Sequence, residues 1–497
     1  MARDALLIMD FGGNAAQNIA RKIRAEKIYC EVVSGDIPAS RVRELNPAGL
    51  VMAGSVPNAA APDPGVWTLD LPVLGIGYGA RHIAQAAGAR ATGQHIDDHL
   101  ASVDLPVHPL FDKASGGMRR IAHADGFTFP EGVSVLTALD GIALCFASDD
   151  DRLYGVQFIP EQNDPDGSRM LVNFAALICG CRPTWIVSSF IEDAVTRIRE
   201  QVGDGHALLG ISGGIDSAVC SALMNRAMGM RLHCLFIDTG LMRKGERAEV
   251  ERVFRDQLGI DLRCIDASAR FMERLKGIVD PTEKRRVIAE EFLAIFEEQA
   301  ARMGVIDYLV QGTNYSDVLE AGTEGGEAAR SHHTISWMPE NIQFKAILEP
   351  VRTLFKDEVR LLGEALELPP SLVWRQPFPG SGLAVRCVGE VTRERLDILR
   401  DADLIFRSEI ASAGIERQLW QYFAVLTQMQ SGAPDAADQY TVILRAVHSA
   451  DPLSAPIFRV PYDLLGRAVR RILAELPQVK RVVYDLSPKP PAGIEWE

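Results

Sequence analysis

The first third of the chain alternates short apolar runs with stretches in which apolar residues recur at helical spacing. Strands are predicted at 6–9, 49–53 and 73–76, and helices at 14–24 and 82–87. Repeated strand–helix alternation is typical of a parallel sheet with helices on both faces, so we predict an α/β fold. Turn signals between 116 and 141 indicate hairpins, and residues 171–178 predict a closing helix.

The same alternation resumes after a break at 179–183, which predicts a domain boundary near residue 185. Beyond it we predict a helix at 186–201 and strands at 207–211, 232–237 and 308–310. A Pro/Gly-rich junction at 377–385 leads to helices at 389–412 and 463–475, strands at 440–447 and 481–486, and an exposed loop at 431–438. The pattern therefore predicts three α/β modules, 1–185, 186–377 and 378–497.

Composition agrees with this organisation. At about 150 residues per domain, 497 residues predict about three domains. Hydrophobic residues make up 47% and charged residues 24%, which excludes a wholly disordered chain. The formal charge of −14 argues against a nucleic-acid surface, because such a surface needs a dense basic stripe.

Nothing in the sequence predicts a membrane partner or an oxidising compartment. The apolar run at 6–9 is too short for a signal-peptide core, and no window approaches the ~20 apolar residues of a membrane span. Eight cysteines do not make a disulfide scaffold, and Cys179 and Cys181 lack a second Cys/His pair that would complete a metal site. We expect a reduced cytoplasmic protein whose cysteines are mostly buried.

The most specific motif is Ser-Gly-Gly-Ile-Asp-Ser at 212–217, which follows an apolar strand and is predicted to open a helix at Ala218. The glycines allow close approach to an anion, and the loop N–H groups and helix N-terminus would point at it. Ser212 and Ser217 add hydroxyl donors, and Asp216 could hold Mg²⁺ on phosphates. Because no Lys follows the glycines, this is not the Gly-Lys-Ser/Thr phosphate loop.

The loop resembles the pyrophosphate loop of N-type ATP pyrophosphatase synthetases, which adenylate a carbonyl oxygen, release pyrophosphate and let a nitrogen nucleophile displace AMP. Further motifs look like the GMP synthetase family; they lie at 235–243, 311–318, 331–333, 349–350, 354–360, 377–380 and 481–497. The resemblance covers essentially the whole chain. It implies a class I amidotransferase-like domain, an ATP pyrophosphatase (adenine nucleotide α-hydrolase-like) domain, and a small α/β domain that forms a homodimer and completes the acceptor site.

The resemblance also implies roles for individual residues. Residues implied to bind ATP are Ser212, Gly213, Gly214, Asp216, Ser217, Phe236, Ile237, Arg243, Gln311, Gly312 and Thr313, with Asp216 also on Mg²⁺. Residues implied to bind the acceptor are Arg375, Pro379, Gly380, Arg445, Lys489, Ile494 and Glu495. Lys356 is implied to neutralise charge on the leaving pyrophosphate, and His332 and His333 fall in what resembles a lid. Without the motifs, Lys356 would read as a surface lysine and the His pair as solvated.

The amidotransferase-like domain lacks the residues its family uses. That chemistry needs a Cys nucleophile, a His base and a Glu that orients the His. This chain has Gly77 at the Cys position and Ile159 at the His position, and only Glu161 remains. The family's Cys lies on a strained strand-to-helix turn, called the elbow, and a substitute such as Cys145 would not lie on it. We therefore predict no glutamine hydrolysis, so the nitrogen would come from free ammonia, a partner enzyme or an amine substrate.

The acceptor motifs are altered too. Gly493 stands where the family has Thr, an Arg is missing from the motif at 435–440, and Trp337 enlarges the lid region. Two interpretations stay open: an ammonia-dependent GMP synthetase acting on XMP, or a paralogue that activates another purine-like or heterocyclic carbonyl, which we favour. A non-catalytic scaffold is a third hypothesis. Sulfur transfer is disfavoured because Cys220 and Cys234 are predicted to be buried.

Overall fold

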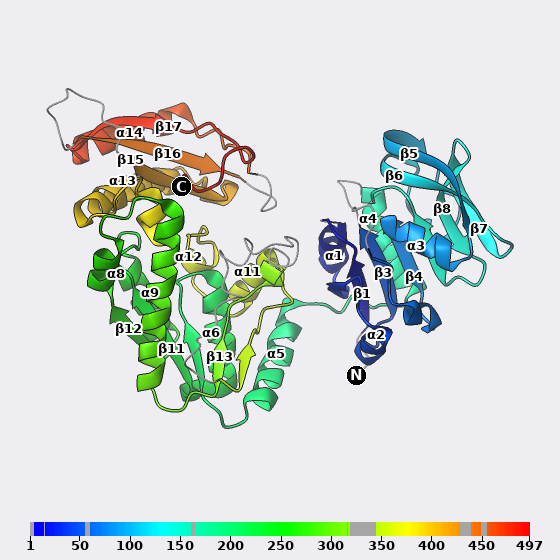
Figure 1. Ribbon diagram of the computed structural model, residues 1–497, viewed down its shortest axis with the longest axis horizontal. Coiled ribbons are helices and arrows are strands. Elements are labelled where there is room, and N and C mark those ends of the chain that lie inside the picture. The colour runs from blue at the N-terminus through cyan, green and yellow to red at the C-terminus, as the bar shows by residue number, and fades with distance from the viewer. Residues whose placement is uncertain are drawn as a thin grey trace. The chain divides into compact units, whose positions relative to one another are not determined.

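The structure is a computed structural model that describes residues 4–13, 15–54, 60–160, 165–315, 317–318, 344–427, 439–448 and 455–497. The described residues form two compact units, one ending at Phe190 and the other beginning at Ile191 (Figure 1). Each unit has its own sheet and is described by itself.

The first unit is built on a seven-stranded sheet in the order β2-β1-β3-β4-β9-β8-β7. Its strands are β1 Ala5–Asp10, β2 Tyr29–Ser34, β3 Gly49–Gly54, β4 Val73–Gly77, β7 Val133–Leu139, β8 Ile142–Ser148 and β9 Leu153–Val156. The first five strands in this order are parallel, and β8 and β7 are antiparallel, so the predicted parallel sheet is confirmed. Its core includes Met52 and Ile83, both fully buried.

The helices of this unit are α1 Ala15–Ala25, α2 Ala39–Leu45, α3 Tyr78–Ala86 and α4 Pro165–Asn173, the last continuing into a π-helical turn, η3 Phe174–Ile178. The predicted hairpins include a two-stranded ribbon of β5 Arg90–Val103 and β6 Gly117–Thr128. The carboxyl end of β4 leads directly into α3, which places Gly77 at a sharp strand-to-helix turn.

The second unit contains a five-stranded parallel sheet in the order β12-β11-β10-β13-β14. Its strands are β10 Ala207–Gly210, β11 Leu232–Asp238, β12 Leu262–Asp266, β13 Tyr308–Val310 and β14 Ala346–Leu348. Its helices are α5 Val187–Val202, which spans the boundary between the units, α6 Ile215–Met228, α7 Glu246–Glu251, α8 Ser268–Leu275, α9 Pro281–Arg302, α11 Lys356–Ala365 and α12 Pro370–Val373. Loops at the carboxyl ends of such strands are the usual place for ligand binding.

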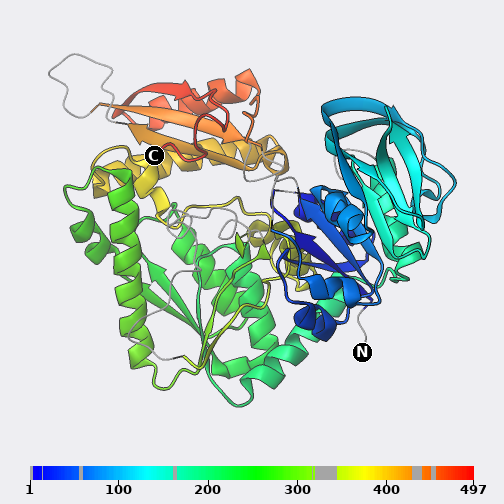
Figure 2. The same ribbon diagram turned by 45° about the vertical axis from the view of Figure 1, so that its right-hand side comes forward.

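The remainder of this unit forms a three-stranded sheet, β15 Gln421–Thr427, β16 Tyr440–Val447 and β17 Val479–Tyr484. It is preceded by a short 3₁₀ turn, η8 Gly382–Arg386, and helices α13 Arg393–Ser412 and α14 Tyr462–Glu475 pack against it (Figure 2). Helix α13 begins later than the predicted residue 389, because the Thr392 hydroxyl caps it by accepting from Arg395 N at 3.2 Å.

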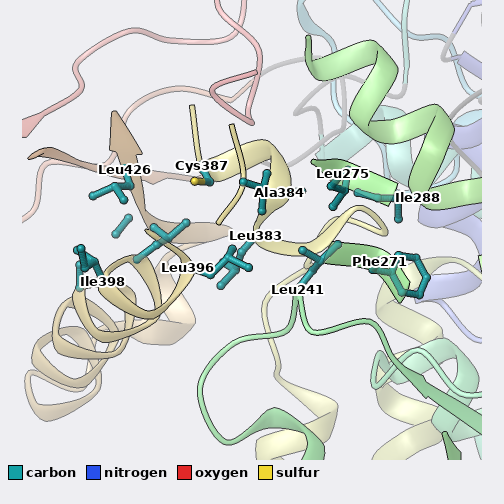
Figure 3. Packing of buried hydrophobic residues seen from close by; sticks show 14 of the residues in the cluster. Leu241, Phe271, Leu275, Ile288, Leu383, Ala384, Cys387, Leu396, Ile398 and Leu426 are labelled. Carbon is teal, nitrogen blue, oxygen red and sulfur yellow. The ribbon is translucent and has the colours of Figure 1, made fainter. Parts of the chain in front are cut away.

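One hydrophobic core runs through both sheets of the second unit. It contains Leu235 and Phe271 from the part with the parallel sheet and Leu396, Leu399 and Leu444 from the C-terminal part. Figure 3 shows Phe271 and Leu396 among the side chains gathered there. The modules predicted at 186–377 and 378–497 therefore share a core, and their boundary stays a prediction.

All eight cysteines lie in described segments and are free, and six of them are buried, as expected. Within the described ranges, we find no helix that combines the length and apolar character of a membrane span.

Candidate functional site

The loop at 212–217, which is predicted to bind phosphate and is here called the phosphate loop, connects β10 to α6. The helix begins at Ile215, earlier than the predicted Ala218, because the Ile215 side chain is buried and Gly214 takes the extended N-cap position. The loop is held by its own hydroxyls: Ser217 Oγ donates to the Gly214 carbonyl at 3.0 Å, and Gly214 N donates to Ser212 Oγ at 3.3 Å. The glycines and the helix N-terminus thus stand together, as an anion site requires.

Lys356 lies beside this loop. It is the first residue of α11, and its ammonium forms an ion pair with the Asp216 carboxylate in the first turn of α6. Asn314 Nδ2 approaches the other Asp216 oxygen at 3.4 Å. The Lys356 side chain is 26% exposed, so it is a paired cation at the loop rather than a solvated surface lysine.

The segment after β13 packs against the same turn. A Cβ at Gly312 would lie 3.2 Å from both Asp216 Cβ and Ser217 N, so glycine permits this close approach. Thr313 is 3% exposed, and its hydroxyl has no hydrogen-bond partner among the described residues. A buried hydroxyl left unsatisfied is unfavourable, so this atom is suited to a ligand.

The strand that carries Phe236 and Ile237, both predicted to bind ATP, is β11. The side chains of Phe236 and Ile237 are fully buried, so these residues can meet a ligand only through their backbone. Pairing with β10 ends opposite Leu235, whereas pairing with β12 continues to Asp238. Beyond Leu235, β10 therefore no longer pairs with the edge of β11 that faces it.

A cavity of about 420 Å³ opens at the carboxyl end of β11. It is lined by Asp238, Gly240, Arg247 and Arg400, among others, and by no residue of the phosphate loop. Arg247 ion-pairs with Asp238 at 3.4 Å, and Arg400 donates to the carbonyl of Met242 at 3.0 Å. The side chains here are already paired with one another, so we place the candidate nucleotide site at the loop.

Two predicted ligand-binding arginines have protein partners. Arg375 donates to the Gly213 carbonyl at 2.9 Å and ion-pairs with Glu246 at 2.5 Å, so this predicted acceptor residue lies against the phosphate loop. Arg243 is 5% exposed and lies 4.3 Å from the centre of the Phe378 ring. Burial lowers the pKa of Arg243 to about 10.

The predicted acceptor residues near the C-terminus are also engaged. Arg445 is 1% exposed and ion-pairs with Asp485, and both Glu495 carboxylate oxygens accept from Arg386 at 2.7 and 2.8 Å. Sequence reasoning missed Arg386; the only signal was an arginine within an apolar run.

The other predicted acceptor residues lie on loops. Pro379 and Gly380 lie on the junction loop before η8, and Ile494 packs beside the outer face of the three-stranded sheet. Lys489 forms an isolated bridge with Ala455.

The first unit has a sharp strand-to-helix turn at Gly77, the position where the resembled family has its Cys nucleophile. Gly77 has φ 58° and ψ −122°, a conformation that strains any residue with a side chain. A Cβ there would lie 3.0 Å from the Gly54 carbonyl and meet nothing else within 4 Å. Cys145 is fully buried, and burial raises the pKa of its thiol, which disfavours the thiolate that a nucleophile needs. Burial raises the pKa of Cys220 and Cys234 as well.

His123, which the sequence analysis did not single out, lies beside this turn with two carboxylates around it. The His123 ring stacks on Tyr78 at 5.2 Å and contacts Asp97 through Nδ1 at 2.5 Å and Asp125 through Nε2 at 3.1 Å. Burial acts to lower the His123 pKa, but the hydrogen bonds that the ring donates to the Asp97 and Asp125 carboxylates, together with their negative charge, outweigh it, and the pKa is raised. Ile159, at the position of the family's His, is partly buried, and its N–H donates to the Arg120 carbonyl at 2.9 Å.

Several predicted residues lie outside the described part of the chain. They are Glu161, His332 and His333 of the predicted sites, together with Trp337 and the loop at 431–438. Their roles stay predictions.

Comparison with known proteins covers the whole chain. Three family models match: Glutamine amidotransferase class-I at residues 7–177, NAD synthase at 187–398 and GMP synthase C terminal domain at 408–496. The GMP synthase (glutamine-hydrolyzing) of Symbiobacterium thermophilum is 45% identical across 100% of this chain and 99% of that protein. The protein of the same name from Ruminiclostridium cellulolyticum is 42% identical over the full length of both.

Solved structures match less closely. A putative GMP synthase protein from Thermoplasma acidophilum is 22% identical, with a TM-score of 0.32, over 35% of this chain and 94% of that one. An NH3-dependent NAD synthetase from Campylobacter jejuni is 18% identical, with a TM-score of 0.30, over 38% of this chain and 76% of that one. At these scores, neither similarity carries an argument.

Proposed function

The chain belongs to the GMP synthase family of ATP-dependent ligases, and we propose that it adenylates a purine-like carbonyl and aminates it without using glutamine. The carbonyl oxygen of the acceptor attacks the α-phosphorus of ATP, which forms a C–O–P linkage and releases pyrophosphate. An amine nitrogen then attacks the same carbon and releases AMP. The observation that carries the first step is the Asp216–Lys356 pair beside the loop at 212–217.

We assign the loop N–H groups and the Ser217 hydroxyl to the phosphates, because they surround the start of α6. Lys356 lies beside them through its ion pair with Asp216, and it stabilises the charge that develops on pyrophosphate. The backbone of Phe236 and Ile237 and the buried Thr313 hydroxyl are suited to adenine and ribose.

The residues around Asp216 fit a magnesium ion. Mg²⁺ is usually held by one or two carboxylates plus substrate phosphates, and Asp216 supplies one carboxylate at the phosphate loop. No cluster of three metal-binding side chains occurs among the described residues. When bound, the ion neutralises phosphate charge.

Loss of glutamine hydrolysis is supported by two positions. Glycine at 77 supplies no nucleophile, and isoleucine at 159 transfers no proton. The nitrogen then comes from ammonia or another amine. The test supplies purified protein with ATP, XMP and either ammonium or glutamine. We expect AMP and pyrophosphate with ammonium only; turnover with glutamine that a thiol alkylator abolishes would contradict this.

Two kinds of compound are candidates for the acceptor substrate. The full-length relatives are named GMP synthases, which favours the XMP acceptor implied by the resemblance, whereas Gly493, where the family has Thr, favours a different purine-like or heterocyclic acceptor. Turnover of XMP at a normal rate decides for the first, and turnover of another acceptor in a mass-spectrometric screen decides for the second. A non-catalytic scaffold would not transfer isotope label from pyrophosphate into ATP, whichever candidate acceptor is present.

We also infer a homodimer through the C-terminal part of the second unit. The proposal rests on the family resemblance, and Tyr462 and Leu486, which are 88% and 70% exposed there, are available to a second subunit. Sedimentation equilibrium would give twice the chain mass of 54.4 kDa; the chain mass itself would contradict the proposal.

A further inference from the structure

The last segment of the chain follows β17 and is here called the C-terminal strap, residues 485–497. It has no helix, and its one extended contact among the described residues is the bridge between Lys489 and Ala455. Figure 1 shows the end of the chain lying beside α9. Three buried cations, each from a different element, hold the strap in place.

Arg445 of β16 closes the base of a loop in the strap. Its guanidinium donates to the Ser487 carbonyl at 2.9 Å on one side of the loop. On the other side it donates to the carbonyls of Gly493 at 2.7 Å and Ile494 at 2.9 Å. The intervening residues 488–492 include Lys489, the predicted acceptor lysine. The Arg445 side chain therefore forms hydrogen bonds on both sides of this segment.

Two further cations fix the end of the strap to the body that carries the phosphate loop. Arg386 of η8 is fully buried, donates to both carboxylate oxygens of Glu495, and lies 3.9 Å from the centre of the Phe423 ring. Lys284 of α9 is also fully buried and ion-pairs with the Glu497 carboxylate at 2.8 Å.

Burial of these cations makes docking of the strap obligatory. A buried cation is tolerated only when acceptors surround it, and here the strap supplies most of the acceptors. An undocked strap would leave the guanidinium groups of Arg386 and Arg445 without the acceptors described above. It would leave Lys284 with only the carbonyls of Ala384 at 3.2 Å and Cys387 at 2.8 Å. The geometry of the strap is therefore set by the rest of the second unit, including the helix that contacts its last residue.

We propose that Lys284, Arg386 and Arg445 are positioning residues that hold the strap loop, and with it Lys489, at the acceptor. Arg445 thus acts through the loop rather than on the acceptor directly. This rests on the proposed function, since it takes Lys489 to face the acceptor, and it adds that a carboxylate on the final residue is part of the acceptor site's support.

The test compares Glu497→Gln with Glu475→Gln, a matched loss of one ion-paired carboxylate on exposed α14. A second variant, Arg386→Lys, keeps the charge but loses the two-pronged contact with Glu495. With XMP, ammonium and ATP, we expect both strap variants to raise the KM for XMP about tenfold, the effect of losing one charge-assisted hydrogen bond, with the KM for ATP unchanged. Glu475→Gln should match the wild type.

Hydrogen exchange gives a readout that needs no acceptor. Glu497→Gln should speed exchange of the strap amides about tenfold and leave α6 unchanged. Equal rises in both KM values, or unchanged strap exchange in both variants, would overturn the proposal. If the wild-type protein turns over no XMP, the XMP assignment fails, and the exchange result alone decides the strap.

Discussion

Lys356 and Asp216 stabilise one another beside the phosphate loop, and each is only about a quarter exposed. In such a place a positive charge is held ready for the phosphates without reorganisation of solvent. The pair therefore links the proposed chemistry to two side chains.

Replacing Lys356 with Met should lower kcat/KM for the synthetase reaction about 10²–10³-fold, the usual loss on removing one preorganised charge stabiliser. The thermal midpoint should change little, because a partly exposed ion pair adds little stability. Steady-state AMP release measures the first effect and calorimetry the second. An Arg352→Met variant, which loses an exposed ion pair with Glu349, is the control.

Restoring the missing glutaminase residues should require both changes. Gly77→Cys and Ile159→His as single variants should hydrolyse no glutamine, because a nucleophile without a base, or a base without a nucleophile, is insufficient. The double variant should release ammonia from glutamine, measured by a coupled glutamate assay. Activity in either single variant would show that another residue supplies the missing group.

The positions of site residues were predictable where a backbone motif defines them. The contacts of long side chains were less predictable. The loop at 212–217 and Lys356 lie together as the motifs imply. Arg375 and Arg445 follow motifs too, but their guanidinium groups contact protein carbonyls. Sequence specifies that an arginine is present, whereas tertiary packing decides which acceptors it reaches.

Between elements, the segment after β13 touches the first turn of α6 through Gly312. Gly312→Ala should destabilise the protein by about 1–3 kcal/mol, since an added methyl group forces the two backbones apart. It should also raise the KM for ATP. Gly466→Ala is the control, because its Cβ would meet only Arg470 Nη1 at 3.5 Å. Gain of about 0.5–1 kcal/mol in helix α14 is expected there, and urea unfolding measures both.

The ribbon of β5 and β6 should show a pH-dependent stability through His123. Its pKa is raised in the folded state, so the stabilisation is fully present below the ordinary value of 6.5 and is lost as pH rises through the folded value. The pKa of Asp97 is lowered by its hydrogen bond to His123, so this contribution also falls in strong acid.

Thermal unfolding of wild type and His123→Gln across neutral pH measures the effect. The wild-type midpoint should fall with rising pH relative to the variant. His448→Gln, a histidine of the second unit, should follow the wild type. Parallel curves for wild type and His123→Gln would refute the assignment.

Elements with long apolar runs were predictable, and several strands at sheet edges were not. Strands β10 and β11 are almost fully buried and match their predicted ranges closely. The edge strands β2 and β12 are partly exposed, so their apolar residues do not form a run. Helix α9 escaped prediction because it buries polar residues such as Lys284.

At the scale of the whole molecule, two separate cores predict two unfolding transitions. Ile83→Ala should shift one transition by about 2–5 kcal/mol, and Leu399→Ala should shift the other by a similar amount, because each is fully buried in its own core. Urea titration followed by circular dichroism checks this. A single transition that both variants shift equally would contradict it.

The sequence predicted three modules, and the described residues form two compact units. Strand and helix periodicity locates elements, but it carries no information on which elements share a core. Leu235 and Leu444 belong to modules that were predicted to be separate, and they lie in one cluster. Only the packed structure reveals this.

The shared core also determines the order in which the newly made protein can fold. Domains fold N-terminal first as the ribosome releases about 5–20 residues per second. The first unit has its whole core once residue 190 has emerged, so it can fold during synthesis. The second unit needs Val479 for its core and Glu497 for Lys284. Its folding can be completed only after residue 497 has emerged, and until then part of its apolar surface stays exposed.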